Sequence, residues 1–376
     1  MLTNLYVKSV IKMLDKYFST RLELSKKKLK SNIDFLKKNI GNNKEIIAVL
    51  KANAYGFGDI ILSKEIIKHG ITEIAVADFE EGLRLRKNNI KVPIMIMYPA
   101  LRNLKPIIDS KLEPSIYSLE MLNKLIFHAK KHKKVVSFHL KIDTGMNRYG
   151  FLEKDLKEVI CKIKEQKNLK IKSIFSHLSS SNLKKYKSFT LKQIQKFNSQ
   201  KRMIQKEFSY KIKSHISNSY GAINYMEENS EMIRVGFGLF YGFNNKQTHC
   251  IGELKTSISQ IKIINKGDSV GYNRKFKSKK IMKIGIIPIG YADGLRRDWI
   301  DKKLYFSLNN IKLPVLGDIS MDSCVIDLSN IKEVKVGDDV ILFGESRCIF
   351  KLSKSLQTIP YEITSGLSKR IRRFLV

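Results

Sequence analysis

The chain has 376 residues, of which 43% are hydrophobic, and this length suits one large and one smaller domain, each with its own core. No apolar run reaches the roughly 20 residues that span a bilayer, and no signal peptide opens the chain, so we expect a soluble, cytoplasmic protein with no membrane partner. The four cysteines are widely spaced and form no C-x-x-C pair. This pattern favours reduced thiols, and no metal is expected.

The net charge is +35, from 70 Lys and Arg against 35 Asp and Glu. Such an excess raises the possibility of a nucleic-acid-binding protein. The lysines are spread along the chain, however, without an RNP signature, a zinc-finger spacing or an arginine-rich arm. We therefore expect no specific nucleic-acid partner, although a basic nucleic-acid-binding protein stays open as an alternative.

Residues 1–18 carry apolar side chains at helical spacing with lysines between them. The segment is predicted to be an N-terminal extension that packs on the body or frays from it, and an interfacial helix is the alternative. A short strand is predicted over 20–24. It precedes the large domain but could join the smaller one.

The run 46–50 is a wholly apolar strand that leads directly into Lys51. Burial disfavours the ammonium form, so a lysine at the end of a buried strand tends toward the free amine that can form a Schiff base. The alternative is a lysine whose stem follows the strand end out to water.

Short apolar runs alternate with amphipathic helical stretches from residue 46 to about residue 242, and the runs number eight. They cover 46–50, 73–77, 93–97, 113–117, 135–142, 171–175, 213–216 and 232–235. Eight strands that alternate with helices predict an α/β fold, a (β/α)8 TIM barrel over 19–248 with its active site at the carboxyl ends of the strands. The third and seventh connections are only weakly helical.

After about residue 249 the sequence changes to β-rich segments separated by turn signals. These segments cover 257–265, 280–289, 311–316, 324–328 and 340–343. We therefore predict a separate, mostly-β C-terminal domain over 249–376.

The residues around Lys51 read VLKANAYGFG, and this stretch closely resembles the cofactor lysine segment of the alanine racemase family. The resemblance implies pyridoxal 5'-phosphate as the cofactor, carried by Lys51, with Tyr55 near its phosphate. Further motifs that resemble the same family span the chain and fall at predicted strand ends.

Three of these motifs lie in the middle of the predicted barrel. In LKIDTGMNRYG the resemblance makes Arg148 a substrate-carboxylate ligand near the cofactor hydroxyl, and Lys141 a site of possible carbamylation that steadies this arginine. In Ser-His-Leu it places His177 beside the cofactor ring. In HISNS it makes Ser219 a phosphate ligand.

The motif IRVGFG follows the eighth predicted strand. The resemblance implies that Arg234 faces the pyridine nitrogen and that the amides of Gly236 and Phe237 bind the phosphate. This agrees with a phosphate held by the loops after barrel strands seven and eight.

The C-terminal domain carries the remaining motifs, VGYN, GYADG, SMD and IPYE. The resemblance makes Tyr272 the second catalytic residue, Tyr291 and the pair Met321 and Asp322 substrate-binding residues, and Tyr361 a phosphate contact. In the family the first three motifs come from the partner subunit, so a homodimer with shared active sites is implied.

The resemblance implies an alanine racemase that supplies D-alanine for peptidoglycan by two-base chemistry, with Lys51 and Tyr272 on opposite faces of the substrate. Phe57 replaces the family's usual histidine and Ser320 its usual cysteine, so the amino-acid specificity is less certain than the reaction. A serine, lysine or broad-specificity racemase of the same fold is the nearest alternative. A non-catalytic pyridoxal phosphate-binding protein is a further one, and the C-terminal domain argues against it.

Overall fold

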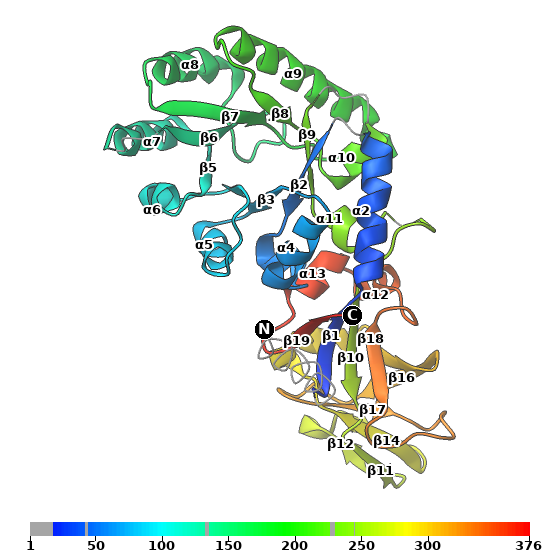
Figure 1. Ribbon diagram of the computed structural model, residues 1–376. Helices are drawn as coiled ribbons and strands as arrows, with labels where there is room; N and C mark the ends of the chain where they lie inside the picture. The colour runs from blue at the N-terminus through cyan, green and yellow to red at the C-terminus, as the bar shows by residue number, and fades with distance from the viewer. Residues whose placement is uncertain (1–17, 42–43, 132–134, 226–229, 244) are drawn as a thin grey trace. The chain divides into compact units, whose positions relative to one another are not determined.

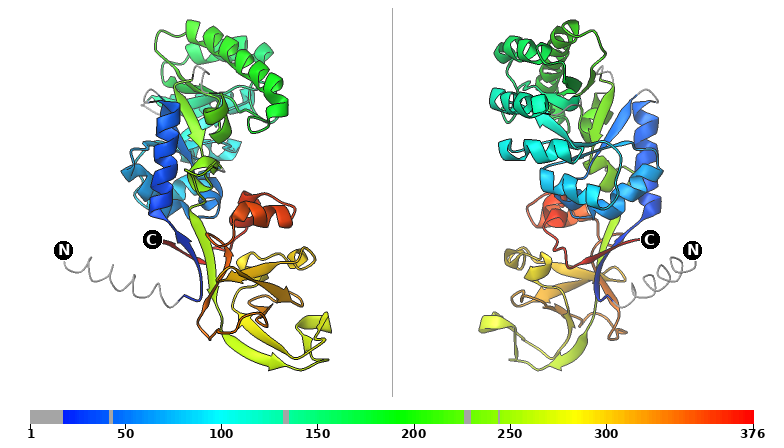
Figure 2. Two further views of the ribbon diagram at one scale, coloured as in Figure 1. Left: turned by 90° about the vertical axis from the view of Figure 1, so that its right-hand side faces the viewer. Right: turned by 60° about the vertical axis from the view of Figure 1, so that its left-hand side comes forward.

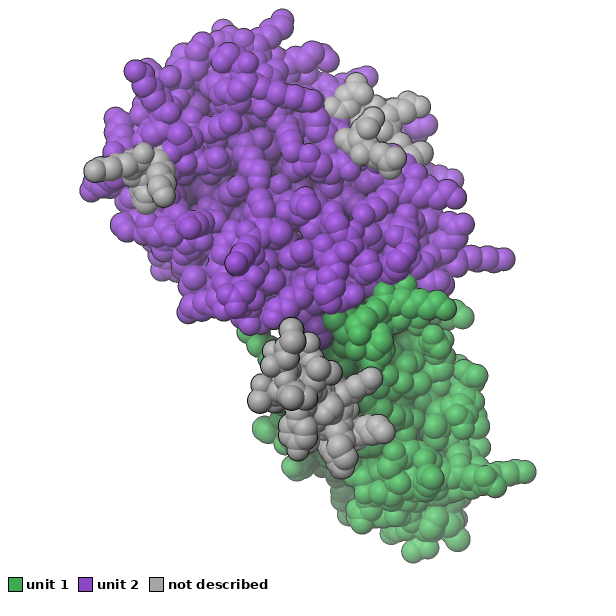
Figure 3. Space-filling model, in the orientation of Figure 1, with its two compact units in different colours: residues 1–28, 250–376 green, residues 29–249 purple. Residues whose placement is uncertain are grey.

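The computed structural model describes residues 18–41, 44–131, 135–225, 230–243 and 245–376. The chain forms two compact units, shown in different colours in Figure 3. One unit is the continuous segment 29–249, and the other combines 1–28 with 250–376. The predicted extension over 1–18 lies outside the described residues, except for Phe18.

The segment 29–249 is built on an eight-stranded parallel sheet that curls into a nearly closed barrel (Figure 1). Its strands are β2 (Glu45–Val49), β3 (Glu73–Val76), β4 (Ile94–Ile96), β5 (Glu113–Ile116), β6 (Val136–Lys141), β7 (Leu169–Phe175), β8 (Lys213–His215) and β9 (Met232–Val235). They follow one another around the barrel in chain order, with β9 beside β2. This confirms the predicted fold class.

Helices precede, connect and follow the barrel strands (Figure 1). They are α2 (Lys26–Ile40), α4 (Asp59–Lys68), α5 (Phe79–Lys87), α6 (Leu104–Asp109), α7 (Leu119–Lys131), α8 (Leu156–Lys164), α9 (Lys187–Lys206), α10 (Ser219–Asn224) and α11 (Phe237–Phe240), with short turns η2 (Leu101–Asn103), η3 (Glu153–Asp155) and η4 (Lys184–Tyr186). The two connections with weak helical patterns hold only the short helices α6 and α10. Their sequences offer too few apolar positions to bury a longer helix.

The barrel closes between β8 and β9 without a regular ladder of backbone hydrogen bonds. Instead, the Arg234 amide donates to the Ser217 carbonyl at 3.1 Å. The Glu231 carboxylate also accepts from both the amide and the hydroxyl of Ser214, at 3.0 and 2.7 Å. Side chains therefore complete what the backbone leaves open on this side.

Two apolar layers fill the barrel unit. Inside the strands, Ile47, Ala75, Met95 and Phe175 belong to one buried cluster. Outside them, a larger cluster joins β6 and β7 to the inner faces of α7, α8 and α9. Truncating one such fully buried leucine or isoleucine to alanine lowers the free energy of unfolding by roughly 2–5 kcal/mol. Packing of this strength fixes where each strand ends and where the loop after it begins.

The other unit contains a nine-stranded sheet in the order β11-β14-β17-β16-β15-β18-β10-β1-β19. The strands are β1 (Thr20–Leu24), β10 (Gly252–Ser257), β11 (Gln260–Ile264), β14 (Met282–Ile287), β15 (Tyr305–Leu308), β16 (Ile311–Leu316), β17 (Cys324–Asp327), β18 (Asp339–Phe343) and β19 (Arg372–Leu375), with a separate pair, β12 (Ser269–Val270) and β13 (Phe276–Lys277). Two short helices, α12 (Ile349–Ser355) and α13 (Pro360–Ser365), and the turns η5 (Tyr272–Arg274), η6 (Tyr291–Asp293) and η7 (Arg297–Trp299) complete it.

The predicted N-terminal strand is β1, and it lies between β10 and β19 (Figures 1 and 2). It pairs antiparallel with β10 and parallel with β19. Leu22 and Leu24 are fully buried there. Among the described residues, no helix combines the length and the apolar character needed to cross a bilayer.

Candidate active site

Lys51 follows the buried strand β2 and begins an unusual turn, α3 (Lys51–Tyr55). Ala52, Asn53, Ala54 and Tyr55 all have positive φ, between 52° and 57°. Each non-glycine residue in this left-handed conformation costs roughly 1–2 kcal/mol, so the turn stores strain and requires support from its surroundings.

Glu81 supplies part of that support. Its carboxylate accepts hydrogen bonds from the amides of Ala52, at 2.5 Å, and Ala77, at 2.8 Å. The side chain comes from the first turn of α5, where Asp78 caps the helix by accepting from the Glu81 amide. Burial raises the pKa of Glu81. Sequence reasoning missed this residue, and its only signal is a second acidic side chain at a helix start.

The environment of Lys51 favours its free amine. Burial lowers the pKa of Lys51, the positive charges of Arg148 and Arg234 lower it further, and the Glu81 carboxylate opposes them. A strand-end lysine in contact with water would not show this combination. The free amine, the form that acts as a nucleophile or a base, is therefore more accessible here than on a lysine in water.

Arg148 lies on a loop organised by Asp143, which follows β6. One Asp143 carboxylate oxygen accepts from the amides of Gly145, Met146 and Asn147 at 2.8, 3.0 and 3.2 Å. The other accepts from the Arg148 amide at 3.2 Å. The guanidinium then donates to the Tyr98 hydroxyl at 2.9 Å. The motif LKIDTGMNRYG contains Asp143 without assigning it a role, and in the structure this carboxylate holds the loop.

Lys141 is the last residue of β6 and is only 4% exposed. Its ammonium nitrogen lies 4.5 Å from the centre of the Phe175 ring, and the Arg234 guanidinium lies 5.3 Å from the same ring. Burial, together with the charges of Arg234 and Arg148, lowers the pKa of Lys141 to about 7. The free amine of Lys141 is therefore accessible at neutral pH.

Arg234 projects from β9 and is 2% exposed. It donates to the carbonyls of Ser176, at 2.5 Å, and His215, at 3.0 Å, and it contacts Nδ1 of His177 at 3.2 Å. Burial and the Arg234 charge lower the pKa of His177 well below its usual value, so this ring is neutral.

Tyr55, Ser219, Gly236 and Phe237 lie at the ends of β2, β8 and β9. The Ser219 hydroxyl accepts from the Gly238 amide at 3.0 Å. A Cβ atom on Gly236 would lie 2.4 Å from the Tyr55 hydroxyl oxygen, so only glycine lets that hydroxyl approach the backbone here. Backbone and hydroxyl groups of these residues are thus uncharged, in contrast to the basic group of Lys51, Lys141, Arg148 and Arg234.

The other unit carries the remaining predicted residues, and three of its loops expose them. Tyr272 is 69% exposed and follows Gly271, which has a φ of 72°. Tyr291 and Met321 are also exposed, and their two loops are joined by a hydrogen bond of 3.0 Å from the Ala292 amide to the Met321 carbonyl. Tyr361 is exposed in α13.

Asp322 is held by Arg370, another residue that sequence reasoning missed. The guanidinium donates to Asp322 at 2.8 Å and forms two hydrogen bonds with the Asp293 carboxylate, at 2.6 and 2.9 Å. Gly290 is required beside it because a Cβ there would lie 2.3 Å from the Met321 carbonyl oxygen. The motifs around residues 290 and 321 therefore form one rigid surface of this unit.

The barrel unit brings five of the predicted residues into one electrostatically coupled group, Lys51, Lys141, Arg148, His177 and Arg234. It also places the Tyr55 hydroxyl beside Gly236, two residues after Arg234. Such a concentration of basic side chains, two of them arginines, at the carboxyl ends of barrel strands suits an anionic ligand with a phosphate and a carboxylate.

Comparison with known proteins identifies the family. Residues 24–244 match the description "Alanine racemase, N-terminal domain" and residues 251–375 match "Alanine racemase, C-terminal domain". The chain is 36% identical over 357 residues to an alanine racemase of Clostridium tetani, covering 90% of this chain and 91% of the relative.

Solved structures agree with this. An alanine racemase of Clostridium difficile 630 superimposes with a TM-score of 0.88 at 29% identity, covering 94% of this chain and 95% of that one. The alanine racemase of Bartonella henselae with covalently bound pyridoxal phosphate does so with a TM-score of 0.84 at 26% identity, covering 95% and 99%. The chain belongs to the alanine racemase family and is a pyridoxal phosphate-dependent amino-acid racemase.

Proposed function

We propose that the protein interconverts L-alanine and D-alanine, with Lys51 and Tyr272 as the two bases, and that it supplies D-alanine for peptidoglycan in the cytoplasm. The observation that carries this proposal is the depressed pKa of Lys51 at the end of β2, among the charges of Arg148 and Arg234. Family membership supports alanine as the substrate.

The residues present fit the cofactor. The glycine at Gly236 leaves room for the Tyr55 hydroxyl, and we propose that this hydroxyl, the Ser219 hydroxyl and the amides of Gly236 and Phe237 bind the phosphate. His177 would lie beside the ring, and Tyr361 is proposed as a further phosphate contact. When bound, pyridoxal phosphate withdraws electrons from the substrate and so acidifies its Cα–H bond.

Lys51 would hold the cofactor and then exchange a proton with one face of the substrate Cα. Its buried amine can accept that proton because burial and neighbouring cations disfavour the ammonium form. Arg234 would donate to the ring nitrogen. Since a guanidinium does not give up its proton in proteins, the ring nitrogen would stay unprotonated, which limits side reactions such as transamination.

Tyr272 would exchange a proton with the opposite face. A neutral tyrosine hydroxyl is a poor base, so the species that accepts the proton would be the phenolate, which a cation such as Arg148 would stabilise. Its high exposure on a tightly turned loop supports a role in a site completed by another subunit. We therefore propose a homodimer with shared active sites, in which Tyr291, Met321 and Asp322 also face the substrate.

Arg148 would bind the substrate carboxylate. We further propose that Lys141 is carbamylated, because carbon dioxide reacts with a free amine and the pKa of Lys141 is lowered to about 7 by burial and by Arg234 and Arg148. The resulting negative charge would pair with Arg148 and fix it.

The test is to incubate the purified protein and pyridoxal phosphate with each L-amino acid and to resolve the enantiomers. Alanine should racemise fastest, and a preference for serine or lysine, or no preference, would replace the proposed substrate. No racemisation would leave a non-catalytic cofactor-binding protein. The ring centres of Phe57 and Tyr241 lie 5.3 Å apart in the core. Phe57 is therefore expected to affect packing near the cofactor more than substrate choice.

The two-base assignment needs a separate experiment. Lys51→Ala and Tyr272→Phe should each be inactive alone. Mixing them under subunit exchange should restore activity, because one site of each hybrid dimer would have both bases. Hybrids that form without activity would contradict the shared site.

A further inference from the structure

We propose that a chain of hydrogen-bonded side chains inside the barrel, from Arg234 through His215, Ser173 and His139 to Glu113, fixes the proton positions on both histidines and thereby holds the Arg234 guanidinium in place. The inference rests on the proposed function in one respect, namely that Arg234 faces the cofactor ring. His139, Ser173 and Glu113 are then positioning residues, remote from the reacting atoms.

This hydrogen-bond chain crosses five strands that follow one another around the barrel, from β9 to β5. Nδ1 of His215 contacts Nη1 of Arg234, and Nε2 of His215 lies 2.8 Å from the Ser173 hydroxyl. That hydroxyl lies 2.7 Å from Nδ1 of His139, whose Nε2 lies 3.2 Å from the Glu113 carboxylate. His215, Ser173 and His139 are fully buried.

The sheet register explains why these side chains meet. His139 lies beside Ser173 across the β6–β7 ladder. His215 lies beside Phe175 across β7–β8, and the two rings stack with their centres 5.1 Å apart. Since Phe175 belongs to the apolar cluster inside the strands, the chain runs through the barrel interior. Water cannot replace a missing link there without displacing packed side chains.

When the His139 ring is neutral, the two ends of the hydrogen-bond chain determine every proton between them. A guanidinium can only donate, so Nδ1 of His215 must accept. Burial and the Arg234 charge lower the pKa of His215 well below its usual value, and the neutral ring then carries its proton on Nε2 and donates to Ser173. The Ser173 hydroxyl, having accepted, donates to Nδ1 of His139. His139 in turn carries its proton on Nε2 and donates to the Glu113 carboxylate.

The Glu113 end is anchored by further charges. Burial alone would raise the pKa of Glu113. The hydrogen bond from His139 is the largest of the effects that lower it to about 2, followed by the positive charge of the His139 ring when that ring is protonated and by the charge of Lys172. The Lys172 ammonium lies 2.7 Å from Glu113 and 3.2 Å from Glu73. Glu113 is therefore a carboxylate at any physiological pH.

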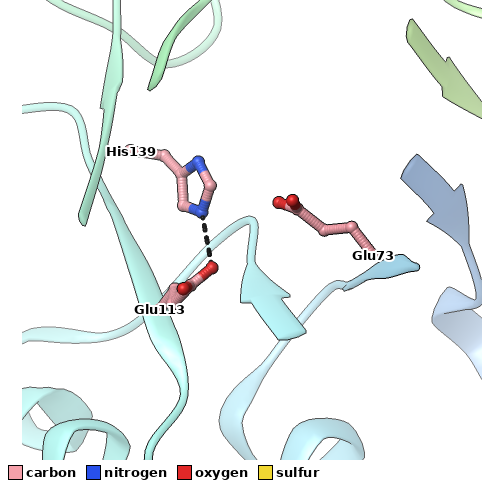
Figure 4. Close-up of side chains that lie close together, drawn as sticks. All are labelled: Glu73, Glu113 and His139. Carbon is pink, nitrogen blue, oxygen red and sulfur yellow. Dashed lines mark hydrogen bonds and ion pairs between the residues drawn. The ribbon is translucent and has the colours of Figure 1, made fainter. Parts of the chain in front are cut away.

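Figure 4 shows Glu73, Glu113 and His139 together, and their ligand atoms lie within 4.8 Å of one another. This spacing would suit a metal ion. The Lys172 ammonium already contacts both carboxylates, however, and His139 already donates to one of them. The cluster therefore serves as the acceptor end of the chain.

The direction of the chain matters for Arg234. If His215 carried a proton on Nδ1, two N–H groups would face each other and repel, and Arg234 would move away from its present position. The chain prevents this because reversing His215 would require reversing Ser173 and His139 as well. Nδ1 of the neutral His215 ring thus orients the buried Arg234 guanidinium without neutralising its charge.

The first test reads the tautomers directly in wild-type protein labelled with ¹⁵N-histidine, by two-bond proton–nitrogen correlation spectra of the cofactor-loaded and cofactor-free forms. His139 and His215 should both carry their proton on Nε2 alone. A proton on Nδ1 of His215, or a doubly protonated ring at pH 7, overturns the proposal. This reading does not depend on activity, whereas racemisation by the same sample tests the proposed function separately.

The second test breaks the chain in the middle with Ser173→Ala and compares it with Ser115→Ala. Ser115 is equally buried, lies beside His139 on the other side across β5–β6, and its hydroxyl has no hydrogen-bond partner among the described residues. Ser173→Ala should lose the single tautomer of His215 and weaken pyridoxal phosphate binding by the cofactor-free protein about tenfold. Ser115→Ala should change neither.

Equal effects of the two substitutions on cofactor affinity would show that Ser173 acts only through packing and would refute the positioning role. If Ser173→Ala fails to fold, His139→Gln and His139→Leu provide the same comparison, because the Gln side chain can accept from Ser173 and donate to Glu113 whereas Leu cannot. Cofactor affinity should be retained better by Gln than by Leu. Equal loss in both contradicts the chain.

Discussion

Lys141 should make the stability of the barrel unit depend on pH, and replacing it with methionine should remove that dependence. In the folded protein burial and the charges of Arg234 and Arg148 lower the pKa of Lys141 from 10.5 to about 7. Between these two values the unfolded chain binds more protons than the folded one, so the free energy of unfolding rises with pH. The stabilisation is complete above 10.5 and is lost as the pH falls through about 7.

The gap between 10.5 and about 7 corresponds to about 5 kcal/mol at 1.36 kcal/mol per pH unit. Between pH 6 and pH 9, where most of the chain's other lysines stay charged in both states, the free energy of unfolding of the wild type should rise by about 2.5 kcal/mol more than that of Lys141→Met.

Urea unfolding of the cofactor-free protein in carbon dioxide-free buffer measures this, followed by far-ultraviolet circular dichroism. That signal comes mainly from the helices, most of which surround the barrel. Lys192→Met, which removes a solvent-exposed lysine of α9, is the matched control and should follow the wild type at both pH values. If Lys141→Met and the wild type respond to pH in parallel, the lysine is not neutralised by its surroundings, and both its depressed pKa and the argument for its carbamylation are wrong.

Three further substitutions test the geometry of the site. Gly236→Ala should displace the Tyr55 hydroxyl, since its Cβ would lie 2.4 Å from that oxygen, and cofactor affinity measured by titration of the cofactor-free protein should fall roughly 10- to 100-fold; unchanged affinity would remove Tyr55 from the phosphate site. Asp143→Asn should destabilise the protein to urea by about 1.5–3 kcal/mol, because an amide cannot accept from the Arg148 backbone with its NH₂ group, and an effect under 0.5 kcal/mol would show that the loop does not need the carboxylate. Ala52→Val should cost about 1–3 kcal/mol because a β-branched residue resists a φ of 53°, whereas Ala52→Gly should stay within about 1 kcal/mol of the wild type; equal effects would argue against the left-handed turn.

The barrel could be predicted from the sequence because its strands are buried on both faces and therefore appear as continuous apolar runs, such as 46–50 before Lys51. In the other unit β16 was predicted with its observed bounds. The short strands β12 and β13 were not, since two residues carry no periodicity. The segment 257–265, expected as one strand, is divided between β10 and β11 because the chain turns at 258–259.

The residues of the candidate site likewise divide into those with a local sequence signal and those without one. Lys51 could be singled out because a charged residue after an apolar strand is a local signal. Glu81 and Arg370 could not, since each supports its partner across a wide gap in sequence, 29 residues from Glu81 to Ala52 and 77 from Arg370 to Asp293. Their tasks depend on hydrogen bonds that form only after the strands have been arranged. The roles of the catalytic and binding residues stay predictions until the experiments above are done.

The position of β1 between β10 and β19 has a consequence for how the chain folds during synthesis. β1 is made near the beginning, but β19 leaves the ribosome about 350 residues later, which takes roughly 20 to 70 s at typical rates. The segment 29–249 is continuous and can complete its own core in that interval. Meanwhile Leu22 and Leu24, fully buried in the finished sheet, have no neighbouring strand. The early strand therefore waits, exposed to chaperones or to strands of other nascent chains, until first β10 and then β19 are synthesised and pair with its two edges.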